Sequence, residues 1–364
     1  MNQGRISKGS EYIDALRGIA ILGVVMVHAS QQVRPRANWL LWFMTEGARG
    51  VQLFFVVSAL TLCMSWAGRF HREQFPVRNF YTRRFFRIAP LFYCAILLYL
   101  CVNGFGASYW APEGIHWWFV FATAFFLHGW HPETINSVVP GGWSIAAEMA
   151  FYVAFPVAIS YLSKISRLLA AFVVSLALYW AFISIVPHAF DLPVRDRYLL
   201  ESFPYLSLWG QLPIFLMGLL VYPLRSRIRM QGLNLAFFLL ILCVCAYFLR
   251  NPFNAHVHHL FGGGLFFALT LLLSFFPVKP LVNGVTIWFG KLSYSIYLVH
   301  FAVISALGSM GVTRLFPNTN TGSLMYMVLI AVSAGVLAMV SKKLIEDPFI
   351  AYGGRLIARR ESVN

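Results

Sequence analysis

Charged residues are scarce in this sequence: of 364 residues, 11% are charged and only 13 are Asp or Glu. Soluble domains carry about a quarter charged residues, so this composition excludes an ordinary soluble protein. Alternation of apolar and polar residues at strand spacing is also missing, which excludes an outer-membrane β-barrel. Apolar residues make up 59% of the chain and occur in repeated runs of about 20. The sequence therefore predicts an all-α fold, a polytopic transmembrane helical bundle.

The chain also has few cysteines, and none of them shows metal-ligand spacing. Its five cysteines fall in apolar segments, so we expect neither a disulfide framework nor a metal site (Cys63, Cys94, Cys101, Cys243 and Cys245). The net charge of +15 is spread over loops between apolar runs, which is typical of topology signals and argues against nucleic-acid binding. No cleavable signal peptide is expected, because the first apolar run reaches membrane length and holds charges.

Ten apolar segments are long enough to span a membrane, and a shorter one, 115–130, is expected to be interfacial or re-entrant. This assignment places 19 Lys and Arg on the inner side and 6 on the outer side, with both termini cytoplasmic, as the positive-inside rule requires. We predict a multi-pass protein of the cell inner (plasma) membrane. Residues 1–364 are expected to form one integral-membrane domain with no appended soluble domain. The predicted spans are 12–30, 48–66, 89–105, 143–162, 168–187, 206–222, 233–249, 259–276, 286–309 and 323–341.

The first span holds two ionisable residues on one face. Arg17 and His28 are eleven positions apart, which at ~100° per residue brings both side chains to the same side of a helix. At ~1.5 Å per residue they lie ~16 Å apart along the axis, too far for a hydrogen bond. Ionisable groups at membrane depth are costly and are by default functional. The alternative is that Arg17 extends to one membrane interface and His28 caps the other end.

The loop before the third span is the most basic part of the chain. Arg83, Arg84 and Arg87 precede Pro90, which we expect to fix the start of that span. Such a cluster commonly binds anionic lipid headgroups. The alternative is a site for a phosphorylated cofactor that arrives from the cytoplasm, because guanidinium groups match phosphate geometry.

Residues 106–142 contain no Lys or Arg but many aromatic residues, which form either an interfacial belt or a stacking platform for sugars. Trp143, Ser144 and Glu148 follow at the start of the fourth span. Ser144 and Glu148 are four positions apart and share a helix face. A carboxylate about one turn inside the membrane needs a cation, a proton or water beside it, and Arg17 or His28 can supply that partner.

The last two spans carry further polar residues. The ninth span, 286–309, is expected to direct its serines and tyrosines into the bundle before it reaches His300. After the tenth span, Glu346, Asp347 and Pro348 are expected to close the last helix at the inner surface.

Together these stretches resemble the acyltransferase-3 family of membrane O-acyltransferases, which includes bacterial cell-envelope glycan O-acetyltransferases. The resemblance covers nearly the whole chain and rests, in order, on DALRGIAILGVVMVH, FFVVSALTL, RRFFRIAPLFY, WSIAAEMAFY, FGKLSYSIYLVH and IEDP. One departure lies in the second span, where the family usually has Ser-Gly-Phe and this chain has Ser58, Ala59 and Leu60. The glycine that would allow close backbone approach there is absent.

The resemblance implies transfer of an acyl group, commonly acetyl from acetyl-CoA, to a hydroxyl of an extracytoplasmic glycan or glycolipid. It implies that His28 is the general base or the acyl carrier. Arg17, lower on the same helix, would hold the donor, and Glu148 would be a third catalytic residue. The donor would reach Arg83, Arg84 and Arg87 from the cytoplasm. The remaining expected substrate contacts are Trp143, Ser144, Ser58 and His300.

Two other classes of function fit parts of the sequence. A transporter or flippase for an envelope glycan or lipid intermediate would also place ionisable groups inside a helical bundle. We find no pair of Gly- or Pro-interrupted spans in matching halves, which such proteins often have. An inactive structural partner of a glycan-assembly complex is the second alternative, and the joint presence of Arg17, His28 and Glu148 argues against it.

Overall fold

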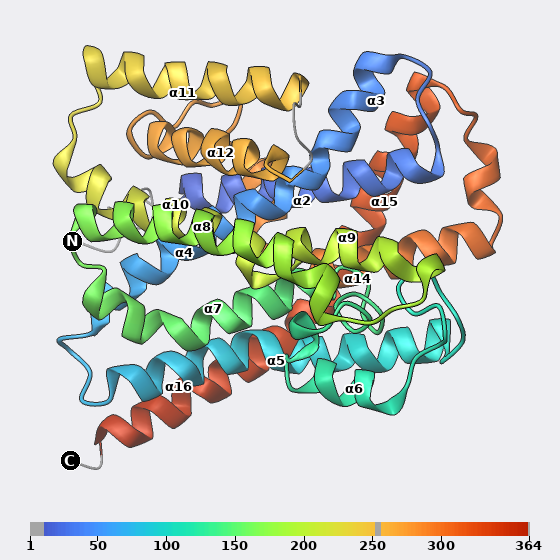
Figure 1. The fold of residues 1–364 in the computed structure, drawn as a ribbon, viewed down its shortest axis with the longest axis horizontal. Helices are drawn as coiled ribbons and strands as arrows, with labels where there is room; N and C mark the ends of the chain where they lie inside the picture. The colour runs from blue at the N-terminus through green and yellow to red at the C-terminus, as the bar shows by residue number, and fades with distance from the viewer. Residues whose placement is uncertain (1–10, 252–255, 363–364) are drawn as a thin grey trace. The chain divides into compact units, whose positions relative to one another are not determined.

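The computed structural model describes residues 11–251 and 256–362, and these residues form helices without a strand (Figure 1). Within them, nine helices are long and apolar enough to cross a membrane. The number is ten if the bent pair α13 (Gly284–Lys291) and α14 (Ser293–Ser309) counts as one span. The all-α, multi-span class is thus confirmed, whereas the orientation of the termini stays a prediction. The short stretch 115–130 contains the eight-residue helix α6 (Trp117–Ala124), which is too short to cross a bilayer.

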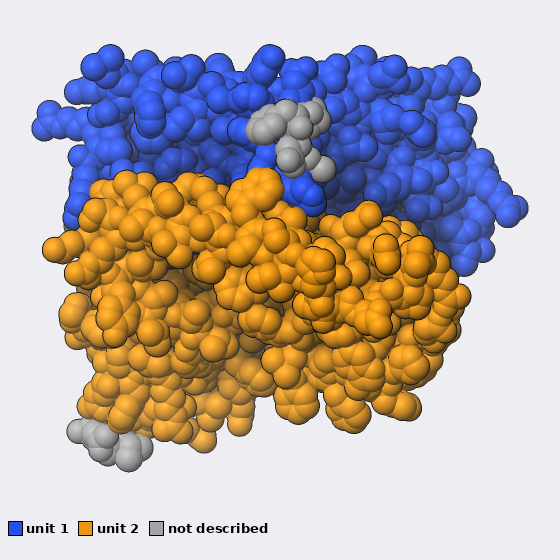
Figure 2. Space-filling view, in the orientation of Figure 1, with its two compact units in different colours: residues 1–60, 217–342 blue, residues 61–216, 343–364 orange. Residues whose placement is uncertain are grey.

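The chain divides into two compact units, shown in blue and orange in Figure 2. Unit 1 consists of residues 1–60 and 217–342, and unit 2 of residues 61–216 and 343–364. The chain passes from one unit to the other within α4 (Gly50–Arg69), α10 (Leu208–Arg227) and the π-helical turn Lys342–Glu346.

Helix α2 (Glu11–Gln32), which corresponds to the first predicted span, is the central element of unit 1. It packs against every one of the following elements: α3 (Asn38–Thr45), η1 (Glu46–Arg49), α12 (His258–Phe275), α13, α14 and α15 (Asn320–Ser341). Unit 1 also contains α11 (Leu233–Arg250), which packs along α12 (Figure 1), η4 (Val312–Leu315), and the parts of α4 and α10 that lie in residues 50–60 and 217–227.

The contact between α2 and α13 depends on two glycines. A Cβ atom at Gly18 would overlap the carbonyl of Thr286, and one at Gly290 would overlap the carbonyl of Asp14. Small residues let helix backbones approach closely where lipid provides no hydrophobic driving force between helices. This crossing therefore fixes the Arg17 end of α2 against α13.

The ninth predicted span is broken, which corrects the expectation of a continuous helix. α13 and α14 meet at Leu292 at an angle of 79°. Asn283 starts α13 with a capping box, because its side chain accepts from Thr286 N at 3.1 Å while Thr286 Oγ1 accepts from Asn283 N at 3.2 Å. α13 is therefore a separate short helix, and α14 alone carries His300.

Unit 2 contains the Arg-rich segment within one long helix, α5 (Pro76–Asn103). The expectation that Pro90 starts this helix is wrong: Pro76 occupies its first turn and Pro90 lies inside it. A proline is tolerated inside a membrane helix where its neighbours satisfy the freed carbonyl. The other elements are α6, η2 (His128–Trp130), α7 (Gly142–Tyr161), α8 (Ile165–Ala189), η3 (Val194–Asp196), α9 (Arg197–Leu206) and α16 (Asp347–Ser362).

The C-terminal region also differs from the expectation. Asp347 and Pro348 do not close the last helix, because α15 continues through the π-helical turn into α16. Pro348 lies directly after the π-helical turn, at the second position of α16. α16 packs along α5 in unit 2 (Figure 1).

Candidate active site

His28 lies near the end of α2 in unit 1 and is half-buried. Its Nδ1 lies 2.9 Å from Oε1 of Gln31, one turn further along the helix. An amide oxygen only accepts, so Nδ1 carries the proton and Nε2 keeps its lone pair. The ring lies 4.4 Å from the Phe301 ring and 5.4 Å from the His300 ring, centroid to centroid. His28 therefore presents a basic nitrogen in an aromatic environment that contains a second imidazole.

His300 is fully buried in α14. Its Nδ1 donates to the carbonyl of Tyr297 at 2.7 Å, which fixes the same tautomer as in His28. Its Nε2 has no hydrogen-bond partner within the described part of the chain. The structure thus brings His28 and His300 together, two residues that the sequence places 272 positions apart. Their proximity follows from the packing of α14 on α2, which sequence spacing does not reveal.

Arg17 lies on the same uninterrupted helix as His28, as predicted. Its Nη1 is 3.6 Å from Oδ1 of Asp14, one turn earlier, and both side chains are partly exposed. An ion pair of this type within one helix contributes only about 0.3–0.5 kcal/mol. Asp14 therefore orients the guanidinium without holding it firmly.

Ser58 is buried in α4 within unit 1. The glycine that the acyltransferase-3 pattern has after this serine is replaced by Ala59, yet the helices still approach closely here. The small residue is on the other helix: a Cβ at Gly218 of α10 would lie 2.5 Å from the Val56 carbonyl and 2.8 Å from the Ala59 Cβ. Close backbone approach is thus maintained by Gly218.

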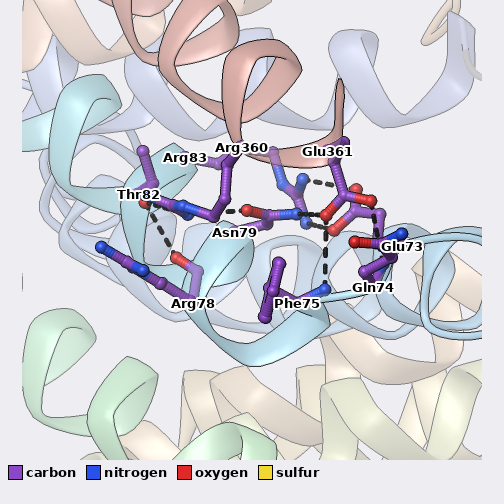
Figure 3. A network of polar contacts seen from close by, with 9 residues as sticks. All are labelled: Glu73, Gln74, Phe75, Arg78, Asn79, Thr82, Arg83, Arg360 and Glu361. Carbon is purple, nitrogen blue, oxygen red and sulfur yellow. Dashed lines mark hydrogen bonds and ion pairs between the residues drawn. The ribbon is translucent and has the colours of Figure 1, made fainter. Parts of the chain in front are cut away.

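Arg83 belongs to a dense polar network in unit 2 (Figure 3). Its two terminal nitrogens donate to the two carboxylate oxygens of Glu73, at 2.6 and 3.1 Å. Beside this pair, Asn79 accepts from Arg360 at 2.7 Å and donates to Glu361 at 2.7 Å. The sequence did not predict this network, because Arg360 and Glu361 lie on α16, about 280 positions away from Asn79.

Arg84 and Glu148 lie in one cluster of unit 2. The guanidinium carbon of Arg84 lies 5.4 Å from the ring centroid of Tyr152 and 5.7 Å from that of Phe80. The Tyr152 hydroxyl donates to Oε1 of Glu148, and Glu148 acts on Arg84 electrostatically. Within its own unit, Glu148 therefore has Arg84 and Tyr152 as neighbours. Arg87, one turn after Arg84, is exposed.

Trp143 and Ser144 are buried in the first turn of α7. Ser144 Oγ donates to the Gly141 carbonyl at 3.1 Å, and the Trp143 ring lies 5.6 Å from the Tyr205 ring. Gly141 has φ of 78°, a left-handed conformation that glycine adopts without strain. Both side chains are thus fixed by a turn at the start of the helix.

The preceding segment anchors this turn through His128. Its Nε2 donates to the carbonyl of Gly142 at 3.0 Å, and its ring stacks on Phe92 at 5.7 Å. Burial lowers the pKa of His128 to about 4, so the imidazole is neutral near pH 7. Within the described residues, no group of three or more His, Cys, Asp or Glu side chains is placed to hold a metal ion.

Comparison with known proteins gives the same family as the resemblance in the sequence. The family described as Acyltransferase domain (Acyl_transf_3) matches residues 10–341. "Putative O-acetyltransferase SAR0937" of Staphylococcus aureus (strain MRSA252) is 24% identical over 393 residues, covering 96% of this chain and 59% of the relative. Peptidoglycan O-acetyltransferase OatA of Listeria monocytogenes is 26% identical over 330 residues, covering 80% and 49%. The chain thus spans between about half and three fifths of the length of these relatives. No solved structure gives a significant match.

Proposed function

The chain belongs to the acyltransferase-3 family, and from this premise we propose that it is a membrane O-acetyltransferase. The proposed reaction moves an acetyl group from acetyl-CoA on the cytoplasmic side to a hydroxyl of a cell-surface glycan on the other side of the inner (plasma) membrane. The Listeria relative is named a peptidoglycan O-acetyltransferase, and this supports an envelope glycan as the class of acceptor.

The observation that carries this proposal is the pair of imidazoles formed by His28 and His300. Both rings donate from Nδ1 to a carbonyl oxygen, so both Nε2 atoms keep lone pairs. A neutral imidazole has an ordinary pKa of ~6.5 and suits removal of a hydroxyl proton during attack on a thioester. The Phe301 ring contacts both imidazoles, with centroids 4.4 Å from His28 and 4.2 Å from His300.

Two routes of acetyl transfer can use these groups. In the first, His28 Nε2 takes the proton of the glycan hydroxyl while the hydroxyl oxygen attacks the thioester carbonyl. CoA then leaves as the thiolate and receives that proton from His28. In the second, His28 Nε2 attacks the carbonyl itself. CoA leaves as the thiolate, the hydroxyl oxygen then attacks the acyl-imidazole, and the hydroxyl proton passes to the thiolate as the neutral imidazole is released.

We give the three arginines of α5 different roles in binding of the donor. Within unit 2, we assign the phosphates of CoA to Arg84 and Arg87. Arg17 of unit 1 keeps the donor contact that the resemblance implies. Arg83 is held by both carboxylate oxygens of Glu73, so we assign it to the support of the loop before α5. Glu148 then acts through Arg84 and Tyr152, whereas Trp143, Ser144 and Ser58 keep the substrate contacts that the family pattern implies.

A transporter remains the second candidate because one observation favours it, the 79° break between α13 and α14. Discontinuous helices form substrate sites in many transporters. The two candidates differ in what happens to the acyl group. A transporter moves a glycan without breaking a thioester, whereas an acetyltransferase releases one CoA for each acetyl ester formed.

The test uses the full chain in proteoliposomes, with labelled acetyl-CoA on one side and envelope glycans on the other. We expect label on the glycan with wild type and its loss with His28→Ala. Label retained on the protein without acceptor identifies the acyl-imidazole route, and its absence identifies the general-base route. Transfer by His28→Ala at the wild-type rate would contradict the site assignment. Glycan transport without CoA release would contradict the function.

A further inference from the structure

A pocket lies beside His28 at the same end of α2. Its volume is about 530 Å³, within the range of about 300–1,000 Å³ for small-molecule sites. One wall is a single face of α3, formed by residues at i, i+3, i+4 and i+7: Asn38, Leu41, Trp42 and Thr45. The opposite wall consists of Ser30 and Gln31 of α2 and Arg34 of the connecting loop. All of these residues belong to unit 1.

The loop that carries Arg34 is held in place from a distant part of the chain. Asn318 accepts from the Arg34 backbone N–H at 2.9 Å, and Asn320 accepts from that of Ala37 at 2.9 Å. Arg36 donates from Nε to the Asn318 carbonyl at 3.2 Å. The backbone of Arg34 is therefore fixed before any ligand arrives.

The two arginines of this loop have different roles. The Arg36 guanidinium hydrogen-bonds to the Asn318 carbonyl and so stabilises the loop, whereas Arg34 is one of the residues that line the pocket. No hydrogen bond or ion pair of the Arg34 guanidinium occurs among residues 11–251 and 256–362. The pocket lining itself contains no Asp or Glu. A cation at the pocket without a carboxylate in the wall favours an anionic ligand.

The other residues that line the pocket can form hydrogen bonds with the hydroxyl groups of a ligand. Asn38 and Gln31 offer both donors and acceptors, and Ser30 and Thr45 offer hydroxyl oxygens. Trp42 and Leu41 supply an apolar wall of the kind that packs on sugar rings. Gln31 also connects the pocket to the chemistry, because its Oε1 accepts the proton of His28 Nδ1. A ligand that contacts Gln31 in this pocket is one side chain away from the Nδ1 side of the His28 ring.

We propose that this pocket binds the acceptor, and that Arg34 holds a carboxylate or phosphate of it, so that the acceptor is an anionic saccharide. This inference rests on the proposed acetyl transfer and adds the class of acceptor. The same guanidinium can also meet the phosphate of a lipid headgroup. The saccharide is favoured by the polar side chains of both walls and by the link through Gln31 to His28.

The test measures binding separately from transfer. The full chain in phosphatidylcholine nanodiscs is titrated, at low ionic strength, with two tetrasaccharides of equal length. One is the hyaluronan tetrasaccharide, which carries two carboxylates, and the other is the uncharged chitin tetrasaccharide. The variants are Arg34→Gln and the matched control Arg314→Gln, which removes an exposed arginine elsewhere in unit 1.

We expect wild type and Arg314→Gln to bind the anionic tetrasaccharide more tightly than the neutral one. Arg34→Gln should weaken anionic binding by about tenfold to a hundredfold, the effect of one hydrogen bond to a charged group, and leave neutral binding unchanged. Thermal unfolding of each variant establishes that it is folded. Equal affinity of wild type for both probes, or an unchanged affinity in Arg34→Gln, overturns the proposal. So does an Arg34→Gln effect confined to retention on phosphatidylglycerol vesicles, which would make the site a lipid contact.

Transfer assays separate this inference from the proposed function. Arg34-dependent binding of the anionic probe without any acetyl transfer would contradict the function and leave the pocket assignment standing. Acetyl transfer with the same acceptor KM in Arg34→Gln and wild type would overturn the pocket assignment and leave the function standing.

Discussion

His300 in unit 1 and His128 in unit 2 are both buried histidines that hydrogen-bond to backbone carbonyls. Each donates from one ring nitrogen to a backbone carbonyl, His300 to Tyr297 and His128 to Gly142. In each, the other ring nitrogen has no partner among the described residues. Burial and hydrogen bonding alone therefore do not distinguish them.

The neighbours of the two rings do distinguish them. His300 lies beside a second imidazole, that of His28, which hydrogen-bonds to Gln31 of the pocket wall. His128 stacks on Phe92, which in turn stacks on Phe126. A buried imidazole contributes to chemistry only where a substrate or a titratable group can reach it. His128 instead joins the start of α7 to the segment before it.

The largest expected effect is loss of the imidazole next to His300. His28→Ala should lower acetyl transfer by about 10²–10⁴-fold, as for a lost general base, without loss of folding. Labelled transfer from acetyl-CoA measures the rate. The matched control is His188→Ala, which removes an exposed histidine of α8 in unit 2 and should leave the rate unchanged. Equal transfer rates for His28→Ala and His188→Ala would show that the His28 region of unit 1 has no special role in the reaction.

The second prediction concerns stability, since His128 should have no role in the chemistry. Burial lowers its pKa to about 4, while the unfolded value is ~6.5. Between these values the unfolded chain binds more protons, so stability is fully present above pH 6.5 and is lost as the pH falls towards 4. The loss should reach about 3 kcal/mol.

The variant His128→Gln isolates this contribution. Its amide nitrogen can still donate to Gly142 but does not titrate, so acid should destabilise it less than wild type. Thermal unfolding at a series of pH values measures the difference, and transfer at pH 7 should be unchanged. Identical pH dependence in both proteins would show that His128 is not protonated on unfolding.

The sequence predicted the regular parts of this molecule well. Hydropathy located the spans because an apolar run of membrane length has few alternatives to a helix. The step from Arg17 to His28 was predictable because it lies within one helix. The 79° break at Leu292 was not, because the serines around it are compatible with a continuous helix. Pro90 was misread as a helix start because a membrane helix tolerates an internal proline.

Most of the residues that contact the site residues could not be predicted from the sequence. His300 meets His28, and Arg360 meets Asn79, only through helix packing between distant segments. A cluster of arginines indicates where positive charge gathers, but it does not indicate which member is already paired. The pair of Arg83 with Glu73 illustrates this, since the ten positions between them span a turn and the start of α5.

The third prediction tests whether the hydrogen bonds of Arg83, like that of His128, stabilise the fold and take no part in binding of acetyl-CoA. Arg83→Glu places two carboxylates together and should destabilise the protein by about 1.5–3 kcal/mol. The double variant Glu73→Arg/Arg83→Glu restores an ion pair and should recover most of that stability with an unchanged Kd for acetyl-CoA. Denaturant unfolding and donor titration measure the two quantities. A tenfold weaker donor Kd in the stable double variant would place Arg83 on the phosphates.

The smallest expected effect concerns Gln31, which links the pocket to His28. Gln31→Leu removes the acceptor of the Nδ1 proton, so the ring loses its fixed tautomer and orientation. A net hydrogen bond contributes about 0.5–1.5 kcal/mol, which corresponds to a decrease in kcat of about threefold to tenfold. Gln31→Glu keeps an acceptor at the same place and should retain more of the rate.

The control for Gln31 is the next residue in the chain. Gln32→Leu makes the same chemical change at an exposed position that does not line the pocket, and it should leave kcat unchanged. The two kinetic constants separate the two roles of Gln31. A fall in kcat with little change in acceptor KM means that Gln31 positions His28. A rise in KM alone means that Gln31 contacts the acceptor only, and His28 then keeps its orientation through its ring contacts with Phe301 and His300.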